Sequence, residues 1–227
     1  MLGGDCTVGI GTVAGHVSAG ERVGLIYFDT HADLNIPSSV PEGALDWMGV
    51  AHMLGEPGAC PELVNAGPVV PLLEPDRVLL FAWGPDQATL HERDAIERRG
   101  LSVVPVDDVA ADPVRAAARA LALMDRRCDR LLVHFDVDVI DFTDVPLSEN
   151  TGRNQGLSYD QALSALAALL ASPRLAGITI TELNPDHAED GTQSIERLAG
   201  SLAAGLARHS DFVAPRLAQR NRGLAAS

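Results

Sequence analysis

The stretch Asp29-Thr30-His31-Ala32-Asp33 follows Val23-Gly24-Leu25-Ile26-Tyr27-Phe28, a short apolar run. Such a run is typical of a buried strand, and three potential metal ligands come after it at every second position. Because side chains two residues apart share one face of an extended chain, Asp29, His31 and Asp33 are expected to converge. The stretch therefore predicts a core strand with a site at its carboxyl end.

A second stretch repeats this arrangement about a hundred residues later. The apolar run Leu131-Leu132-Val133-His134-Phe135 leads into Asp136-Val137-Asp138. If the two strands are neighbours, four carboxylates lie close together, and like charges cannot all stay ionised there without cations between them. One or two divalent metal ions would satisfy the arrangement.

Further apolar runs alternate with helical patterns, which indicates parallel βαβ units. In an open parallel sheet, ligands bind beyond the carboxyl ends of the strands where the strand order reverses. Glu182, which follows the last run, is also expected at that edge. The predicted strands cover 23–28, 77–82, 101–106, 131–135 and 178–181. The predicted helices cover 7–18, 47–54, 88–99, 112–127, 158–171 and 192–208.

Composition limits the possible partners and compartments. The chain has 227 residues, 46% of them hydrophobic, and a formal net charge of −14. This charge argues against nucleic acid or an anionic membrane as a partner, and no run approaches the roughly 20 apolar residues of a membrane span. Three cysteines and no visible signal peptide fit the reducing cytoplasm. We expect a single domain over 1–227, with an exposed tail over 213–227.

The donor types point to a particular metal chemistry. A carboxylate-bridged pair of divalent ions acidifies water into a nucleophile near neutral pH, and Asp29 and Asp136 are the natural bridges. Mostly oxygen donors with one imidazole suit Mn²⁺ or Mg²⁺, whereas a thiolate favours softer metals. The remaining predicted ligands are Cys6, His31, Asp33 and Asp138.

The other histidines have simpler interpretations. His134 shares the strand face of Asp136 but lies one step deeper, so we interpret it as a packed or supporting residue and not as a ligand. The rest lie in helical or loop contexts and are expected to be structural or exposed: His16, His52, His91, His187 and His209.

Four motifs, in order and over nearly the whole chain, make this sequence resemble the ureohydrolases, which include arginase, agmatinase and formiminoglutamase. The family pattern Gly-Gly-Asp-His appears here with cysteine in the last position. The matching segments are Gly3-Gly4-Asp5-Cys6, Asp29-x-His31-x-Asp33, Asp136-x-Asp138-x-x-Asp141 and Glu182-Leu183-Asn184-Pro185.

This resemblance implies both a fold and an activity. The implied fold is a three-layer αβα domain whose open parallel sheet has the order 178–181, 131–135, 23–28, 77–82, 101–106. The implied activity is hydrolysis of a linear C–N bond in a small guanidino or amidino compound by two Mn²⁺ ions. Glu182 would hold the guanidinium group through a charge-assisted contact, and Asp46 occupies the position of the family's proton-shuttling residue.

Three departures from the family pattern shape the expectation. Cys6 replaces a histidine ligand, a replacement that also occurs in a branch cleaving N-hydroxyarginine. Glu42, Ala44 and Asp46 stand where arginases grip the carboxylate of an amino acid, so arginine is an unexpected substrate. The strands that precede Gly-Gly-Asp in the family are missing or truncated here. Strand 178–181 would then present a bare edge, covered by more of a longer protein or by another subunit of a homo-oligomer.

The sequence thus predicts a metal-dependent hydrolase that acts on a cationic guanidino compound other than arginine. Two alternatives stay open. One is hydrolysis of a hydroxyguanidine or formimino compound, and the other is a catalytically degraded, metal-binding homologue.

Overall fold

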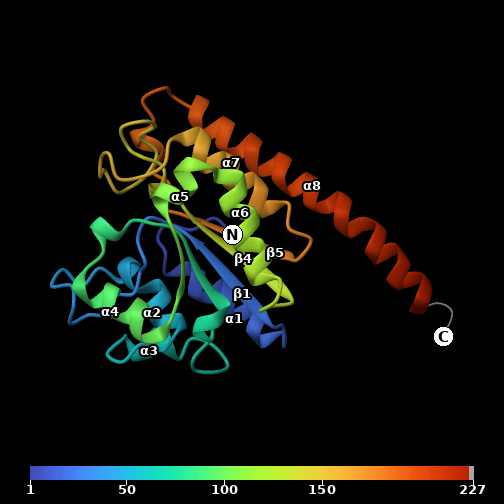
Figure 1. The fold of residues 1–227 in the computed structure, drawn as a ribbon, viewed down its shortest axis with the longest axis horizontal. Coiled ribbons are helices and arrows are strands. Elements are labelled where there is room, and N and C mark those ends of the chain that lie inside the picture. Colours follow the sequence, from blue (N-terminus) through green and yellow to red (C-terminus); the bar gives the residue numbers. More distant parts are fainter. Residues whose placement is uncertain (225–227) are drawn as a thin grey trace.

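The computed structural model describes residues 1–224, which contain a sheet of five parallel strands (Figure 1). The strands are β1 Val23–Phe28, β2 Val78–Trp83, β3 Ser102–Pro105, β4 Arg130–Asp136 and β5 Leu175–Thr181. Their order across the sheet is β3-β2-β1-β4-β5, which confirms the predicted order. The strand order therefore reverses between β1 and β4, which is where ligands of such folds bind.

Strand β1 lies in the middle of the sheet, and its six residues, all apolar or glycine, are all buried. Consecutive side chains point to opposite faces. Leu25 and Tyr27 pack into one core cluster, whereas Ile26 and Phe28 pack into the other. A strand buried on both faces needs a continuous apolar run and not an alternating one.

Helices cover both faces of the sheet, which gives the predicted three layers (Figure 1). The face of Tyr27 carries α1 Val8–Ser18, α2 Gly49–Met53 and α4 Leu90–Arg99, with the short α3 Pro61–Val64 beside them. The face of Phe28 carries α5 Val106–Ala111, α6 Pro113–Met124, α7 Tyr159–Leu170 and α8 Gln193–Leu224.

Local capping explains where several helices begin. The Ser158 side chain accepts a hydrogen bond from the Gln161 amide, and the Gln161 side chain accepts one from the Ser158 amide. This capping box begins α7 within the range where a helix was predicted, 158–171. Thr89 and Glu92 form a second one at the start of α4, and Asp112 caps α6.

Some element boundaries differ from the prediction. The strand expected over 101–106 ends at Pro105, and a separate helix, α5, begins at Val106 with two aspartates in its first turn, where the helix dipole favours them. The helix expected over 47–54 begins as a 3₁₀ turn, Leu45–Met48, before α2. Other 3₁₀ turns are Pro75–Arg77, Pro85–Gln87, Val137–Val139 and Pro185–His187.

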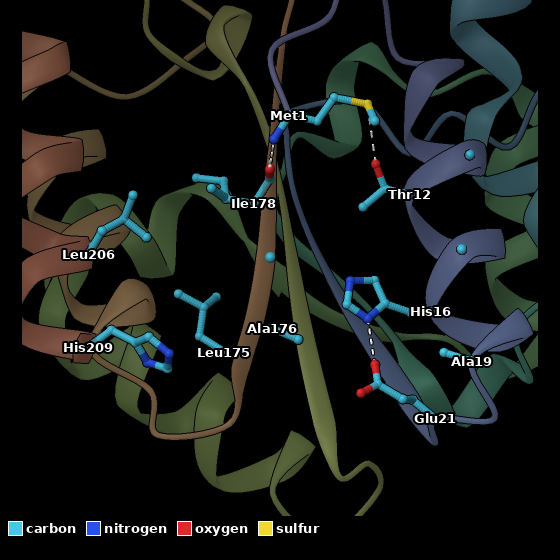
Figure 2. A pocket seen from close by; sticks show the side chains of 13 residues that line it. Met1, Thr12, His16, Ala19, Glu21, Leu175, Ala176, Ile178, Leu206 and His209 are labelled. Atoms are coloured by element: carbon cyan, nitrogen blue, oxygen red, sulfur yellow. Dashed lines mark hydrogen bonds and ion pairs between the residues drawn. The ribbon is translucent and has the colours of Figure 1, made fainter. Parts of the chain in front are cut away.

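The outer edge of β5 is not bare over 178–181, contrary to expectation. Residues 1–4 run parallel to it, with a bridge between Leu2 and Ile180. The Gly3 amide donates to the Ile180 carbonyl at 2.9 Å, the Ile180 amide donates to the Met1 carbonyl at 3.0 Å, and the Glu182 amide donates to the Gly4 carbonyl at 3.0 Å. Beyond this pairing, a cavity of about 690 Å³ follows β5 between α1 and α8 (Figure 2).

The last helix is longer than predicted. It was expected over 192–208, but α8 continues to Leu224 (Figure 1). An exposed tail was predicted over 213–227, and the side chains of these residues lie outside the described part of the chain. Residues 225–227 lie outside it altogether. Among the described residues, no helix combines the length and the apolar character needed to cross a membrane.

Candidate active site

The register of the sheet brings the two predicted clusters together. Phe28 of β1 pairs with Phe135 of β4, so the next residues, Asp29 and Asp136, leave neighbouring strands at the same level. Both aspartates are almost fully buried, with 1% and 2% of their surface exposed. The sequence prediction that these two carboxylates are neighbours therefore agrees with the topology.

The two clusters also share a local turn. One oxygen of Asp29 accepts a hydrogen bond from the His31 amide at 2.7 Å. In the same way, one oxygen of Asp136 accepts from the Asp138 amide at 2.8 Å. Each aspartate thus holds the residue two positions on, so the spacing that looked like extended chain in the sequence is a side-chain-capped turn in the structure.

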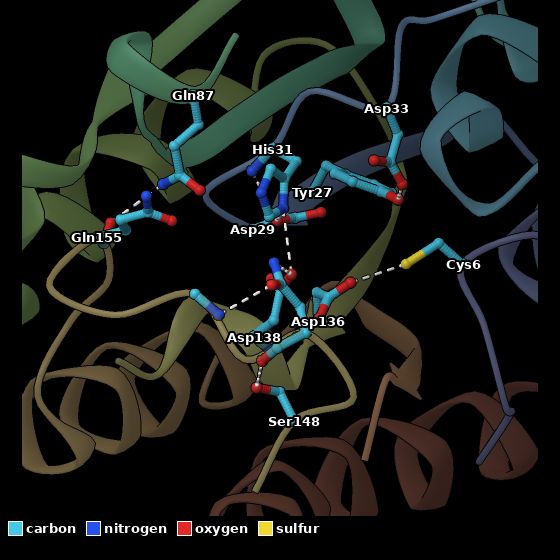
Figure 3. Close-up of polar contacts among 12 residues, drawn as sticks. Cys6, Tyr27, Asp29, His31, Asp33, Gln87, Asp136, Asp138, Ser148 and Gln155 are labelled. Atoms are coloured by element: carbon cyan, nitrogen blue, oxygen red, sulfur yellow. Dashed lines mark hydrogen bonds and ion pairs between the residues drawn. The ribbon is translucent and has the colours of Figure 1, made fainter. Parts of the chain in front are cut away.

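One group of donors, which we name the outer group, consists of Asp29, His31 and Asp138. The His31 Nδ1 lies 3.2 Å from an oxygen of Asp29 and 3.2 Å from an oxygen of Asp138 (Figure 3). Burial would lower the pKa of His31, but the carboxylates of Asp138 and Asp29 outweigh it and raise that pKa well above its usual value. The Asn150 amide supports Asp138 with a hydrogen bond of 3.1 Å.

A second set, which we name the inner group, lies deeper and contains Cys6, Asp33 and Asp136. The Cys6 thiol donates to Asp136 at 2.8 Å, and the Tyr27 hydroxyl donates to Asp33 (Figure 3). Asp33 adopts a left-handed backbone conformation with φ of 49°, a strain of about 1 kcal/mol for a residue other than glycine. Donor atoms of Cys6, Asp29 and Asp33 all lie within 4.8 Å of one another.

His134 is a neighbour of the inner group. It is 1% exposed and stacks on Tyr27 with ring centroids 4.3 Å apart. Its Nε2 lies 3.3 Å from the Cys6 sulfur and 3.1 Å from the Thr181 hydroxyl. Burial lowers the pKa of His134 to about 3, so the ring is neutral. The sequence signal for this proximity was its shared strand face with Asp136.

The electrostatics of these carboxylates show what the site needs. Burial, followed by the neighbouring carboxylates, raises the pKa of Asp29, Asp33 and Asp136 above the usual range. One oxygen of Asp29 and one of Asp138 are buried and have no hydrogen-bond partner among the described residues. A buried unpartnered carboxylate oxygen is costly, so the donor set fits one or more divalent cations.

A cavity of about 520 Å³ opens above the two groups. Asp46 and Glu182 line it, as predicted for substrate-handling residues, whereas Glu42 is exposed and does not line it. Glu182 has a left-handed φ of 59°, and its Oε1 is buried without a hydrogen-bond partner within residues 1–224. Burial, with Asp46 and Asp138, raises the pKa of Glu182 to about 7.

Asp141, the last aspartate of its motif, has a structural task. Its carboxylate accepts hydrogen bonds from the amides of Thr143, Gln155 and Gly156. These bonds close the loop that carries Asn150 beside the outer group. The structure therefore brings together all six predicted ligands, while Asp141 shapes the loop around them.

The chain is similar to known proteins over most of its length. A model of the arginase family matches residues 1–208. The arginase of Bacillus caldovelox is 28% identical over 205 residues, which cover 89% of this chain and 67% of that protein. The solved arginase of Bacillus subtilis superposes with a TM-score of 0.79 at 25% identity, covering 90% of this chain and 69% of that one.

The fold is shared more widely than the sequence. Formimidoylglutamase from Bacillus subtilis superposes with a TM-score of 0.74 at 18% identity, over 93% of this chain and 60% of that structure. At this identity the likeness shows the fold alone. The chain spans about two thirds of the length of the arginases that it matches.

Proposed function

Since this chain belongs to the arginase family, we propose that it is a hydrolase that cleaves a linear C–N bond of a guanidino or amidino compound with two divalent cations. The observation that carries this proposal is the pair of buried, unpartnered oxygens on Asp29 and Asp138. They lie under a cavity that also exposes Glu182. Buried carboxylates repel one another, and a bound metal cation offsets this repulsion.

The proposed ligands follow the two groups of donors. Asp29 and Asp136 would bridge the ions, Cys6 and Asp33 would complete the inner position, and His31 and Asp138 would complete the outer one. The outer set of two carboxylates and one imidazole suits Mn²⁺. Bound divalent ions would supply the Lewis acidity that makes water a nucleophile near neutral pH.

The residues of the cavity would handle the substrate. The guanidinium group of a substrate would donate to Glu182. This charge-assisted contact would give the buried Oε1 of Glu182 a hydrogen-bond partner. A cation there would also lower the pKa of Glu182 from about 7, so binding favours its ionised form. Asp46, at the family's proton-shuttle position, would move the proton of the attacking water to the leaving amine.

The charge of the cavity supports a substrate class. Eight carboxylates line it, and none of its lining residues is lysine or arginine. The eight are Asp33, Asp46, Asp86, Glu92, Asp136, Asp138, Glu149 and Glu182. Such a wall attracts a cation and repels a carboxylate. We therefore propose an amine such as agmatine as a better substrate than arginine.

Urea release tests the function directly. The stripped chain is assayed with agmatine, 4-guanidinobutyrate, arginine and formiminoglutamate, with and without added Mn²⁺; for the last compound, formamide is measured in place of urea. The proposal expects metal-dependent product from at least one guanidino compound. Absence of product from every compound, in a chain that binds two ions, would reject the hydrolase and favour a non-catalytic metal-binding protein.

A further inference from the structure

His134 is a further potential donor beside Cys6 and Asp136 of the inner group. The nearest ring nitrogen of His134 is 3.3 Å from the Cys6 sulfur, and that sulfur is 2.8 Å from an oxygen of Asp136. The three donor atoms lie within 4.8 Å of one another, and all three residues are buried. Beside them, Asp29 is 1% exposed, and one of its oxygens has no hydrogen-bond partner in the described part of the chain.

The separations are those of ligands around one small ion. Zinc binds sulfur at about 2.3 Å and imidazole nitrogen at about 2.0 Å, so these two atoms lie about 3.5 Å apart in a tetrahedral site. The observed 3.3 Å between Cys6 and His134 is close to this value. The shorter contact between Cys6 and Asp136 would have to open when an ion replaces the thiol proton, and Nε2 would exchange its 3.1 Å contact with the Thr181 hydroxyl for the ion.

We propose that His134 binds the inner metal ion through Nε2, beside Cys6 and Asp136, and that the inner position therefore selects Zn²⁺ or Co²⁺ over Mn²⁺. The inference rests on the proposed metal-dependent function, but not on its substrate. Thiolate and imidazole are ligands of borderline metals, whereas the outer group of Asp29, His31 and Asp138 favours harder ions. The two positions would then hold different metals.

The orientation of the ring leaves Nε2 as the nitrogen for this task. The Nδ1 side is closed by helix α1, because a Cβ on Gly9 would lie only 3.0 Å from it. Nδ1 has no hydrogen-bond partner among the described residues. Metal binding through Nε2 leaves the ring proton on Nδ1. One unsatisfied buried N–H costs much less than a structural zinc site returns.

A competing role is that His134 only donates a hydrogen bond to the Cys6 thiolate. X-ray absorption at the zinc edge separates the two roles, because the ring atoms of an imidazole ligand give characteristic multiple scattering beyond the first coordination shell. The experiment uses the full chain with His31→Gln, which removes the imidazole of the outer group. The chain is stripped of metal and reloaded with one equivalent of Zn²⁺, without substrate.

The expected spectrum contains one sulfur and one imidazole per zinc. Adding His134→Gln should remove the imidazole scattering, keep the sulfur, and weaken Zn²⁺ binding at least about tenfold, with a smaller change for Mn²⁺. His52→Gln is the matched control, since His52 is 0% exposed and accepts a hydrogen bond from the Cys60 amide away from the site. The control should leave both signals unchanged.

A zinc shell with sulfur but no imidazole in the His31→Gln chain would overturn the inference and assign His134 the hydrogen-bonding role. A shell without sulfur would overturn it as well. Because this spectrum is recorded before His134 is changed, the result does not depend on the folding of that variant. Failure of the proposed function is distinguishable, since it appears as absent product release while the zinc spectrum retains both ligands.

Discussion

Two buried carboxylates of this protein, Glu56 and Asp29, have opposite surroundings. The Glu56 side chain is 1% exposed and pairs with Arg98 at 2.6 Å and with Arg99. Burial would raise its pKa, but hydrogen bonds from these two arginines lower it. Asp29 is buried as deeply, yet one of its oxygens finds no hydrogen-bond partner among the residues that the structure describes, and burial with Asp138 raises its pKa to about 7.

The difference shows which buried charges the chain balances by itself. At Glu56, helix α4 supplies two guanidinium groups, so that carboxylate is part of the fold. At the ends of β1 and β4, the His31 imidazole lies between Asp29 and Asp138 and pairs with both. One imidazole cannot balance several buried carboxylates, so this region is built for cations that come from outside.

The largest expected effect comes from removing one carboxylate that we assign to both ions. Asp136→Asn should reduce kcat/KM by more than the 10- to 100-fold typical of residues that only support ligands. The fold should survive, because an amide of the same shape relieves repulsion among the neighbouring carboxylates. Activity, metal content and circular dichroism are compared with Asp129→Asn, an exposed aspartate at the base of the same strand. Full activity in Asp136→Asn would contradict the ligand assignment.

The converse change should affect stability and leave the chemistry intact. Glu56→Gln should lower the free energy of unfolding by about 2 kcal/mol, less than the loss of a fully buried pair because Arg98 is half exposed. Metal content and kcat should not change, since Glu56 does not line the active-site cavity. Urea denaturation measures the loss. A drop in metal affinity without a drop in stability would erase the contrast between the two regions.

The pH dependence of the metal-free protein separates the two regions further. The folded-state pKa of Asp29 is raised, so its stabilising contribution is present below pH 4 and is lost as the pH rises to about 7. Asp29→Asn should therefore gain stability relative to wild type over this window, by about 1.4 kcal/mol for each pH unit at most. His134 has the opposite slope, but it is common to both chains and cancels in the difference. Adding Mn²⁺ should reverse the difference and stabilise wild type more than the variant, because Asp29 is a proposed ligand of both ions.

Much of this architecture follows from the sequence because the informative residues lie in regular contexts. The apolar run 23–28 and the Ser158–Gln161 pair each predict their elements by local physics. The neighbouring positions of Asp29 and Asp136 follow from the fold rule for parallel sheets. Local patterns did not predict the pairing of residues 1–4 with β5, or the turn of chain at Val106 into α5.

The site shows the same limit. Five of its six predicted ligands follow from spacing and Cys6 is supported by the family resemblance, but the proximity of His134 to Cys6 depends on long-range packing. The two residues are 128 positions apart in the sequence, and only the parity of His134 with Asp136 indicated the contact. The orientation of the loop at 42–46 was also beyond local rules: Asp46 faces the cavity and Glu42 does not.

The smallest expected effect concerns substrate choice, and it tests whether the unbalanced charge of the site reaches the substrate. Agmatine and arginine share the guanidinium group, and arginine adds an α-carboxylate. The eight carboxylates of the cavity should repel that group, so we expect kcat/KM for agmatine to exceed that for arginine by about tenfold, which corresponds to about 1.4 kcal/mol.

Charge and salt separate this repulsion from simple shape. Glu149 lines the cavity, is exposed, and is held by the Asn184 amide at 2.6 Å, so Glu149→Gln removes one charge with little change in volume. The variant should reduce the preference for agmatine about two- to threefold, and added salt should reduce it in wild type, because exposed charges are screened. A preference for arginine would show that these carboxylates, once metals are bound, no longer present a negative wall. The contrast with Glu56 would then end at the metal centre and would not extend to the substrate.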